Sequence, residues 1–261
     1  MLEATEITLD RLELWLSEPR LNVYLRAAGD DPWRAYELYL WNANLAQVLL
    51  RDISFFEVAL RNSHDRCMTK RWNGEARWLL DPLSPVRNPI LRKSKRSSIF
   101  DANAHNRRAI DAIANDPRGT TDPNRIVPRL TLGFWTHLSD TNHERALWIP
   151  YLHTIWPKGF DRSQLYASLN MINTMRNRAA HAGKLFNLGG ELNVRNCDDA
   201  IVRLMQTLAP AIADWMTNRG QLTPVEHYLK THKLEPDIKA RSSTRNSPYT
   251  TSRRRAGRPQ A

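Results

Sequence analysis

A very long amphipathic helical pattern constrains the fold more than any other feature of the sequence. It opens at Asp31-Pro32 and continues to about Trp72, with apolar residues at the spacing of one helical face. A single bent helix and two helices with a tight break both fit this pattern. Asn42 falls inside the apolar stripe, so we expect it to have a buried hydrogen-bond partner. The stripe comprises Leu38, Leu45, Leu49, Ile53, Phe56, Leu60 and Cys67.

The rest of the sequence also favours helices. No run of alternating apolar and polar residues is long enough to indicate a sheet, so we predict an all-α fold. Gly74 and three prolines predict a loop over residues 74–96. The further helices are expected at about 8–16, at 18–29, in a segment that ends at 114, and at 124–138, 142–156, 161–182 and 198–217.

The helix expected over 161–182 carries the strongest candidate for a functional site. Arg176, Asn177 and His181 lie near its end, and an Arg, an amide and an imidazole are suited to handling a phosphate. On a helical wheel, Arg176 falls in the apolar stripe, roughly 140° from His181. The two side chains converge on one ligand only if the helix loosens near Gly183 or if a second chain supplies half of the site. The alternative is an Arg bound to a buried carboxylate and a solvated His.

A second polar set lies on the long helix. Glu57, Arg61 and His64 follow the i, i+4, i+7 spacing and so share one side of it. We treat them as candidate accessory residues that face the Arg176 motif. An intrahelical Glu–Arg pair with a neighbouring His is the alternative interpretation.

The sequence contains none of the common signatures of metal or nucleotide sites. His137, His143 and His153 are spaced too loosely for a recognisable metal motif, and there is no Cys pair, H-E-x-x-H or Walker loop. We therefore expect no metal and no cofactor. Two cysteines imply no disulfide framework, the first residues do not resemble a signal peptide, and no apolar segment approaches membrane-spanning length. The expected location is the cytoplasm, without a membrane partner.

Positive charge is concentrated at the C-terminal end. The formal net charge is +11, and residues 230–261 contain nine Lys and Arg against two acidic residues. Residues 236–261 are rich in Arg, Ser, Thr and Pro, a composition typical of disorder. We predict a basic, disordered tail over 223–261 that is either a solvated extension or a nonspecific grip on a nucleic acid backbone.

Three segments resemble the successive blocks of bacterial Abi-like (abortive infection) proteins, which belong to the HEPN superfamily. They are YELYLWNANLAQVLLRDISFFEVALRNSHDR (residues 36–66), LTLGFWTHLSDTNHERALWIPYLHTIWP (130–157) and LNMINTMRNRAAHAGKLFN (169–187). The spacing from Arg176 through Asn177 to His181 fits the Arg–His motif of catalytic HEPN members. The resemblance implies a HEPN-like helical bundle over residues 1–222, with a helical insertion at about 75–160.

The resemblance also implies a function. Such proteins act as metal-independent endoribonucleases whose motifs face each other across a homodimer, as abortive-infection or toxin effectors in phage defence, in some cases with an antitoxin partner. The RNA 2′-hydroxyl would attack the adjacent phosphate, with His181 as general base or acid, Arg176 stabilising the transition state and Asn177 orienting the phosphate or the imidazole. A noncatalytic helical module that binds RNA, a nucleotide or a protein is the alternative.

Overall fold

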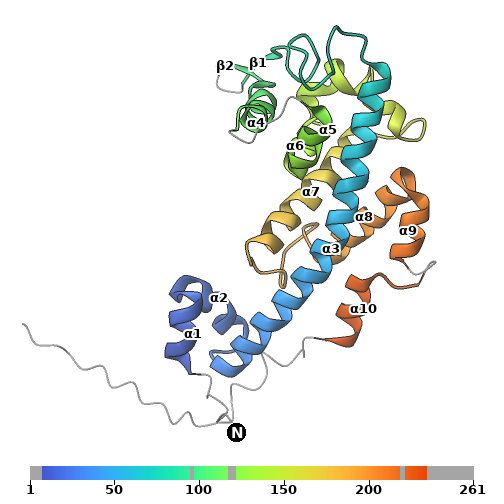
Figure 1. Cartoon of the computed structure of the whole chain (residues 1–261). Helices are drawn as coiled ribbons and strands as arrows, with labels where there is room; N and C mark the ends of the chain where they lie inside the picture. Colours follow the sequence, from blue (N-terminus) through green and yellow to red (C-terminus); the bar gives the residue numbers. More distant parts are fainter. Residues whose placement is uncertain (1–7, 95–96, 117–121, 218–220, 234–261) are drawn as a thin grey trace, which may run out of the picture. The chain divides into compact units, whose positions relative to one another are not determined.

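The described part of the chain is mostly helical. The computed structural model describes residues 8–94, 97–116, 122–217 and 221–233, and helices account for most of them (Figure 1). The all-α class predicted from the sequence is confirmed at this level. The chain divides into two compact units, and the larger comprises residues 42–232. The described residues of the smaller unit are 8–41 and 233.

The smaller unit contains three helical segments. Helix α1 spans Leu9–Leu16, α2 spans Glu18–Ala27, and α3, which spans Pro32–Arg71, begins here. Pro19 lies in the first turn of α2, where its missing N–H leaves no hydrogen bond unmade. A small core forms around Leu12, Leu16 and Leu21, with Leu25, Tyr36 and Tyr39 packed against it.

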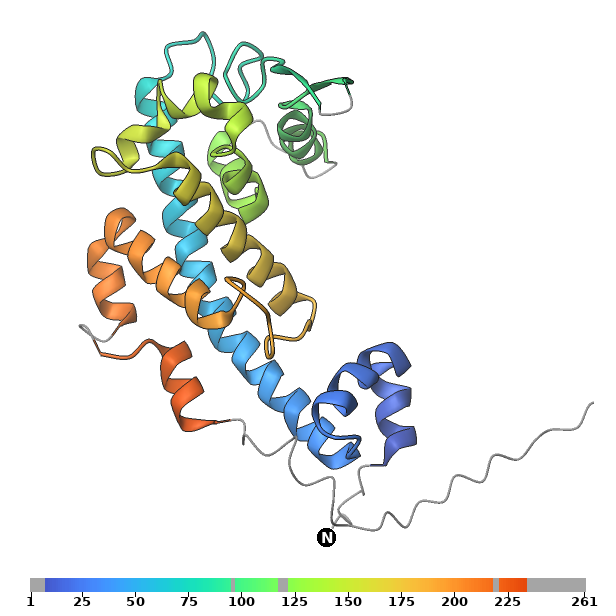
Figure 2. The same cartoon turned by 180° about the vertical axis from the view of Figure 1, so that it is seen from behind.

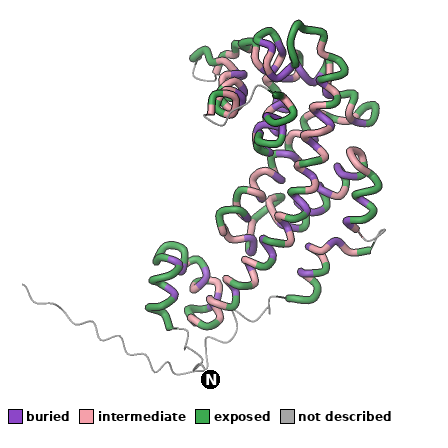
Figure 3. Tube along the Cα trace, in the orientation of Figure 1, coloured by how far each residue is buried: buried purple, intermediate pink, exposed green. Residues whose placement is uncertain are grey.

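The larger unit is built along the rest of α3. This helix continues to Arg71 without a break, so the single-helix form of the prediction is the correct one. Six of the seven stripe residues are buried, and Cys67 is half-buried. Buried and exposed positions alternate along α3, as expected for a helix with one face in the core (Figure 3). Helices α7 (Arg162–Ala180) and α8 (Val194–Leu208) lie beside α3 in both views (Figures 1 and 2). Helices α9 (Pro210–Met216) and α10 (Pro224–Thr231) follow α8.

A mixed segment joins α3 to α7. It contains a short antiparallel hairpin in which β1 (Leu91–Lys93) pairs with β2 (Ile99–Asp101), followed by α4 (Ala104–Ala114). No sheet was predicted here, because three-residue strands are too short to show an alternating pattern. The remaining elements are short: α5 Pro123–Ile126, η1 Val127–Arg129, α6 Leu132–His137, η2 Thr141–His143, η3 Glu144–Trp148 and η4 Leu152–Ile155.

Prolines interrupt three helices that were predicted to be continuous. Pro128 lies where the helix expected over 124–138 changes to a 3₁₀ turn, and Pro150 follows the π-helical η3 inside the expected 142–156 helix. Pro210 separates α8 from α9 within the expected 198–217 helix. Proline has no backbone N–H and its ring clashes with the carbonyl four residues earlier, so these three predictions were wrong in extent.

The predicted tail begins with an ordered helix. In α10, Thr223 and Glu226 form a capping box, and Val225 is fully buried. The Thr223 hydroxyl also donates a hydrogen bond to the Asp198 carboxylate of α8. Residues 234–261 of the predicted tail lie outside the described part of the chain. Within the described residues, no helix has the combination of length and apolar character needed to cross a bilayer.

Candidate functional site

Helix α7 presents the predicted motif at its C-terminal end. The Asp161 carboxylate caps the other end by accepting hydrogen bonds from the backbone N–H groups of Ser163 and Gln164. The helix buries one apolar face and then stays regular through Ala180, with His181 as its C-cap. The buried face consists of Leu165, Leu169, Ile172, Met175 and Ala179.

The end of α7 is a Schellman motif. The Gly183 N–H donates to the Arg178 carbonyl at 2.7 Å, and the Ala182 N–H donates to the Ala179 carbonyl at 3.3 Å. This motif requires a left-handed residue after the C-cap, and Ala182 takes that conformation with a φ of 51°. A Cβ at Gly183 would lie 3.1 Å from the Arg178 carbonyl oxygen. The helix therefore ends sharply after His181 and does not loosen within the motif.

The three motif residues differ in exposure. Asn177 and His181 are exposed, whereas Arg176 is half-buried on the side of the helix that carries the apolar face. The Arg176 Nη1 donates a hydrogen bond to the Asn177 Oδ1 at 3.3 Å. Because α7 stays regular, Arg176 and His181 keep their angular separation of roughly 140° around the helix axis. Convergence through an unwound helix end, one of the two routes left open by the sequence, is excluded.

Glu57 on α3 is the acidic residue next to Arg176. Burial raises the pKa of Glu57, while the charges of Arg176 and Arg61 and a hydrogen bond from the Leu132 N–H oppose the rise. Arg61 also donates a hydrogen bond from its Nη1 to the Pro128 carbonyl at 3.4 Å. The half-buried carboxylate thus balances part of the positive charge around the motif. The alternative interpretation expected Arg176 to be bound to a buried carboxylate, and Glu57 meets it only in part, because it is half-buried and acts on Arg176 through its charge.

His64 belongs to the core. Its ring is fully buried, approaches the Trp135 ring, and has its Nδ1 2.9 Å from the Leu60 carbonyl oxygen. Burial lowers the pKa of His64 to about 4 despite this hydrogen bond. The imidazole is therefore neutral near pH 7 and shielded from a ligand in solution.

Asn42 has the buried partner that the sequence analysis required. Its Nδ2 donates a hydrogen bond to the Gly183 carbonyl at 3.1 Å, and its Oδ1 accepts one from the Leu185 N–H at 2.7 Å. Both partners lie in the segment that directly follows the motif. Asn42 therefore positions this segment against α3, and its role as a positioning residue for the site was not predicted.

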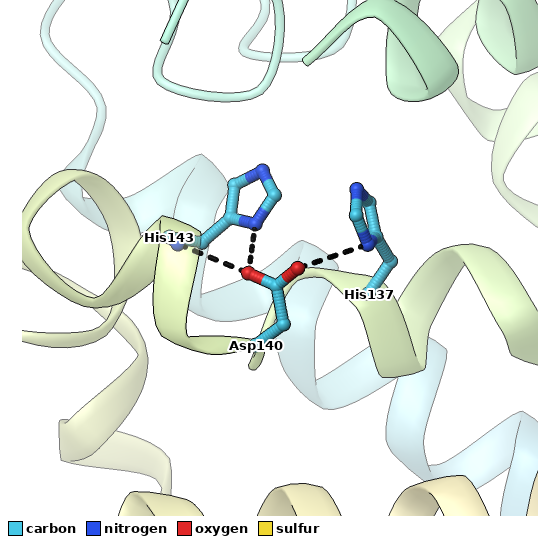
Figure 4. A group of neighbouring side chains, drawn as sticks. All are labelled: His137, Asp140 and His143. Carbon is cyan, nitrogen blue, oxygen red and sulfur yellow. Dashed lines mark hydrogen bonds and ion pairs between the residues drawn. The ribbon is translucent and has the colours of Figure 1, made fainter. Parts of the chain in front are cut away.

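A second cluster lies in the segment between α3 and α7, at the end of α6 and in η2. The Asp140 carboxylate lies between two imidazoles, 3.2 Å from the His137 Nδ1 and 2.6 Å from the His143 Nδ1 (Figure 4). His143 is fully buried, and Asp140 is nearly so. Although burial alone would raise the pKa of Asp140, hydrogen bonds from both histidines keep it far below its ordinary value.

His137 and His143 were expected to form no metal motif, because they were compared only with His153. The intervening Asp140 is the residue that brings the two rings together. The spacing H-x-x-D-x-x-H was the available signal. The ligand atoms of the three residues all lie within 4.8 Å of one another, so they are the described residues best placed to hold a metal ion.

Comparisons with known proteins give no assignment for either site: no family model, no curated protein and no solved structure matches the chain.

Proposed function

We propose that the chain is a metal-independent endoribonuclease of the Abi/HEPN type that acts as a homodimer through the end of α7. The observation that carries the proposal is the exposed imidazole of His181 on the same regular helix end as the half-buried guanidinium of Arg176. A guanidinium is a rigid donor for phosphate oxygens, and an imidazole exchanges protons near neutral pH. Together they form the minimum set for cleaving a ribose-linked phosphodiester.

The proposed reaction needs only the substrate, water and these side chains. The RNA 2′-oxygen forms a bond to the adjacent phosphorus, and the bond from phosphorus to the 5′-oxygen breaks. A base takes the 2′-hydroxyl proton and an acid protonates the leaving 5′-oxygen, with His181 in one of these roles and water in the other. Arg176 stabilises the charge on the phosphorane-like transition state, and Asn177 orients the phosphate or the imidazole. The products are a 2′,3′-cyclic phosphate and a 5′-hydroxyl, so DNA remains intact.

A homodimer explains how two separated side chains serve one phosphate. With the helix regular to Ala180, Arg176 and His181 of one chain point in different directions. A second copy packed against the end of α7 would supply the missing partner of each residue. A half-buried Arg176 on the apolar side of α7 suits such an interface.

The test is cleavage of RNA by the purified full chain in EDTA. We expect the Arg176→Ala and His181→Ala variants each to lose activity by about 10²–10⁴-fold. The His227→Ala variant, which removes another exposed imidazole, serves as the matched control and should cleave normally. A melting curve in EDTA accompanies each assay, so that unfolding is not mistaken for lost chemistry. Undiminished cleavage by both variants would overturn the proposal.

Mixing the two inactive variants tests the shared site. If each site combines Arg176 from one chain with His181 from the other, a mixed dimer has one intact site and regains activity. Without such recovery, the site is formed within one chain or the dimer does not exchange.

A noncatalytic binding module is the second candidate, and the position of Glu57 favours it. This carboxylate balances the charge of Arg176, a feature of a guanidinium with a structural role. Under this alternative the wild type binds RNA without cutting it. The Arg176→Ala variant alone is less stable than the wild type, and replacing Glu57 as well restores normal stability.

A further inference from the structure

The two imidazoles of the Asp140 cluster are held at their Nε2 atoms by neighbouring polar groups. The His137 Nε2 lies 3.2 Å from the Ala102 backbone carbonyl oxygen, which can only accept a hydrogen bond. The His143 Nε2 lies 3.0 Å from the Asn103 Oδ1 and 3.4 Å from the Asn106 Nδ2. The Asn103 amide cannot flip, because its Nδ2 donates to the backbone carbonyls of Pro85 and Asn88 at 2.9 Å and 2.6 Å. These contacts occupy both Nε2 atoms, so the Nδ1 atoms are the ring nitrogens that face Asp140.

The Nδ1 atoms of both rings face the Asp140 carboxylate, at 3.2 Å for His137 and 2.6 Å for His143 (Figure 4). Ionised Asp140 offers only acceptors, so protons on the Nδ1 atoms make these contacts hydrogen bonds in the ion-free chain. A histidine nitrogen binds a metal in its deprotonated form, so a cation would take the place of these protons. A single divalent cation would then be bound by both nitrogens and the carboxylate at once.

The geometry points to a binding site for one Zn²⁺-class ion, formed by the Nδ1 atoms of His137 and His143 and the carboxylate of Asp140. Imidazole nitrogen together with one carboxylate selects such an ion over Mg²⁺ or Ca²⁺, which prefer oxygen ligands. The surrounding contacts match those of metal-ligating histidines, which donate their second ring N–H to a carbonyl or carboxylate group. The inference does not depend on the proposed ribonuclease activity, because the cluster shares no residue with the α7 motif.

The ligands and their supports come from separate elements. His137 ends α6, Asp140 caps η2 and His143 is its last residue, and Ala102 and Asn103 lie between β2 and α4. The Asp140 carboxylate is also fixed by the backbone N–H groups of Asn142 and His143 at 2.8 Å and 3.1 Å. A bound ion would therefore hold η2 to the end of α6 and raise the thermal stability of the chain. His137 is half-buried, with its side chain 27% exposed, which gives an ion access from solvent.

The test is a calorimetric titration of the dialysed full-length chain with Zn²⁺, repeated with Mg²⁺, together with elemental analysis of the loaded protein. We expect one Zn²⁺ per chain, a rise in melting temperature with Zn²⁺, and no response to Mg²⁺. His137→Gln and Asp140→Asn should each weaken Zn²⁺ binding by at least about tenfold. Asn at position 140 can still cap η2, and His137 is half-buried, so these two changes spare the fold better than a change at His143.

His105→Ala is the matched control. The His105 ring is exposed and lies 5.7 Å from the His137 ring, yet it belongs to no part of the proposed site. This variant should bind Zn²⁺ with the affinity of the wild type. That result would show that the bound Zn²⁺ is not held by exposed surface histidines. The inference is overturned if the wild type binds no stoichiometric Zn²⁺, or if folded His137→Gln and Asp140→Asn bind it with unchanged affinity.

Discussion

Asn42 and Leu185 are joined by a 2.7 Å hydrogen bond from the Leu185 N–H to the Asn42 Oδ1, although 143 positions separate them in the sequence. The other half of the same amide donates to the Gly183 carbonyl at 3.1 Å. One buried side chain of α3 thus satisfies two backbone groups in the segment after α7. Because this segment follows His181 directly, the two hydrogen bonds of Asn42 fix the position of the chain just after the candidate site.

Replacing Asn42 by Ala should destabilise the larger unit. The change leaves the buried Leu185 N–H and the Gly183 carbonyl without their partner, and each such loss costs about 1–3 kcal/mol. We expect the free energy of unfolding, measured with urea, to fall by roughly 2–4 kcal/mol. Asn170→Ala, at an exposed position of α7, is the control and should change it by less than about 0.5 kcal/mol. Equal effects of the two variants would contradict the positioning role of Asn42.

The left-handed residue after α7 offers a stabilising substitution. Ala182 has a φ of 51°, where the Cβ of an L-residue is crowded and glycine is not. Ala182→Gly should raise the free energy of unfolding by about 0.5–1 kcal/mol. Gly183→Ala, next to it, should lower this free energy because its Cβ would meet the Arg178 carbonyl oxygen at 3.1 Å. Denaturation curves of both variants check the pair, and the same sign for both would be inconsistent with the Schellman geometry.

Asp198 should make stability decrease as the pH rises. Burial raises its pKa to about 7, Asp52, Glu226 and Asp199 add to the rise, and the hydrogen bond from Thr223 opposes it. Between the ordinary pKa of 3.8 and about 7, the folded chain keeps a proton that the unfolded chain has released. Folding in that window takes up a proton, so the contribution of Asp198 to stability is complete below pH 4 and is lost by about pH 7.

Asp198→Asn isolates this effect. The amide cannot ionise, so the variant should gain about 2–4 kcal/mol relative to the wild type between pH 4 and pH 8. Urea denaturation at a series of pH values gives the difference. Asp214→Asn, which changes an exposed carboxylate that does not contribute to the pKa of Asp198, should leave the pH profile of the wild type unchanged. A constant difference between wild type and Asp198→Asn across the series would refute the raised pKa.

Glu57→Gln tests the charge balance around Arg176. The change removes the carboxylate that offsets Arg176 and Arg61 while keeping a polar side chain of the same size. We expect RNA affinity to rise several-fold at low salt, with a steeper salt dependence, because more positive charge faces the phosphate backbone. Fluorescence anisotropy of a labelled RNA measures both. A lower affinity would mean that Glu57 supports RNA binding.

Long, strongly periodic segments were predictable from the sequence. The apolar stripe identified α3 to within a residue at either end, and the single polar residue inside the stripe, Asn42, was expected to have a buried partner. Arg176 was expected in the apolar face of α7 and is half-buried. These features follow from helical geometry alone, which the sequence encodes locally.

The segment between α3 and α7 was less predictable, because its structure depends on short elements and distant contacts. Apolar spacing continued across Pro128 and Pro150, so periodicity outweighed the proline signal. The His143 environment depends on Asn103, which lies 40 positions away, and on two carbonyls that fix this amide. No local pattern reveals such a contact, although the spacing of His137, Asp140 and His143 was visible.

Cleavage of one RNA oligonucleotide and of its counterpart with a 2′-deoxyribose at the cut position tests the central claim most directly. With the wild-type chain in EDTA, mass spectrometry should find a 2′,3′-cyclic phosphate and a 5′-hydroxyl from the RNA and no product from the deoxy counterpart. Cleavage of both substrates, or RNA that is bound and left whole, would contradict an endoribonuclease that uses Arg176 and His181.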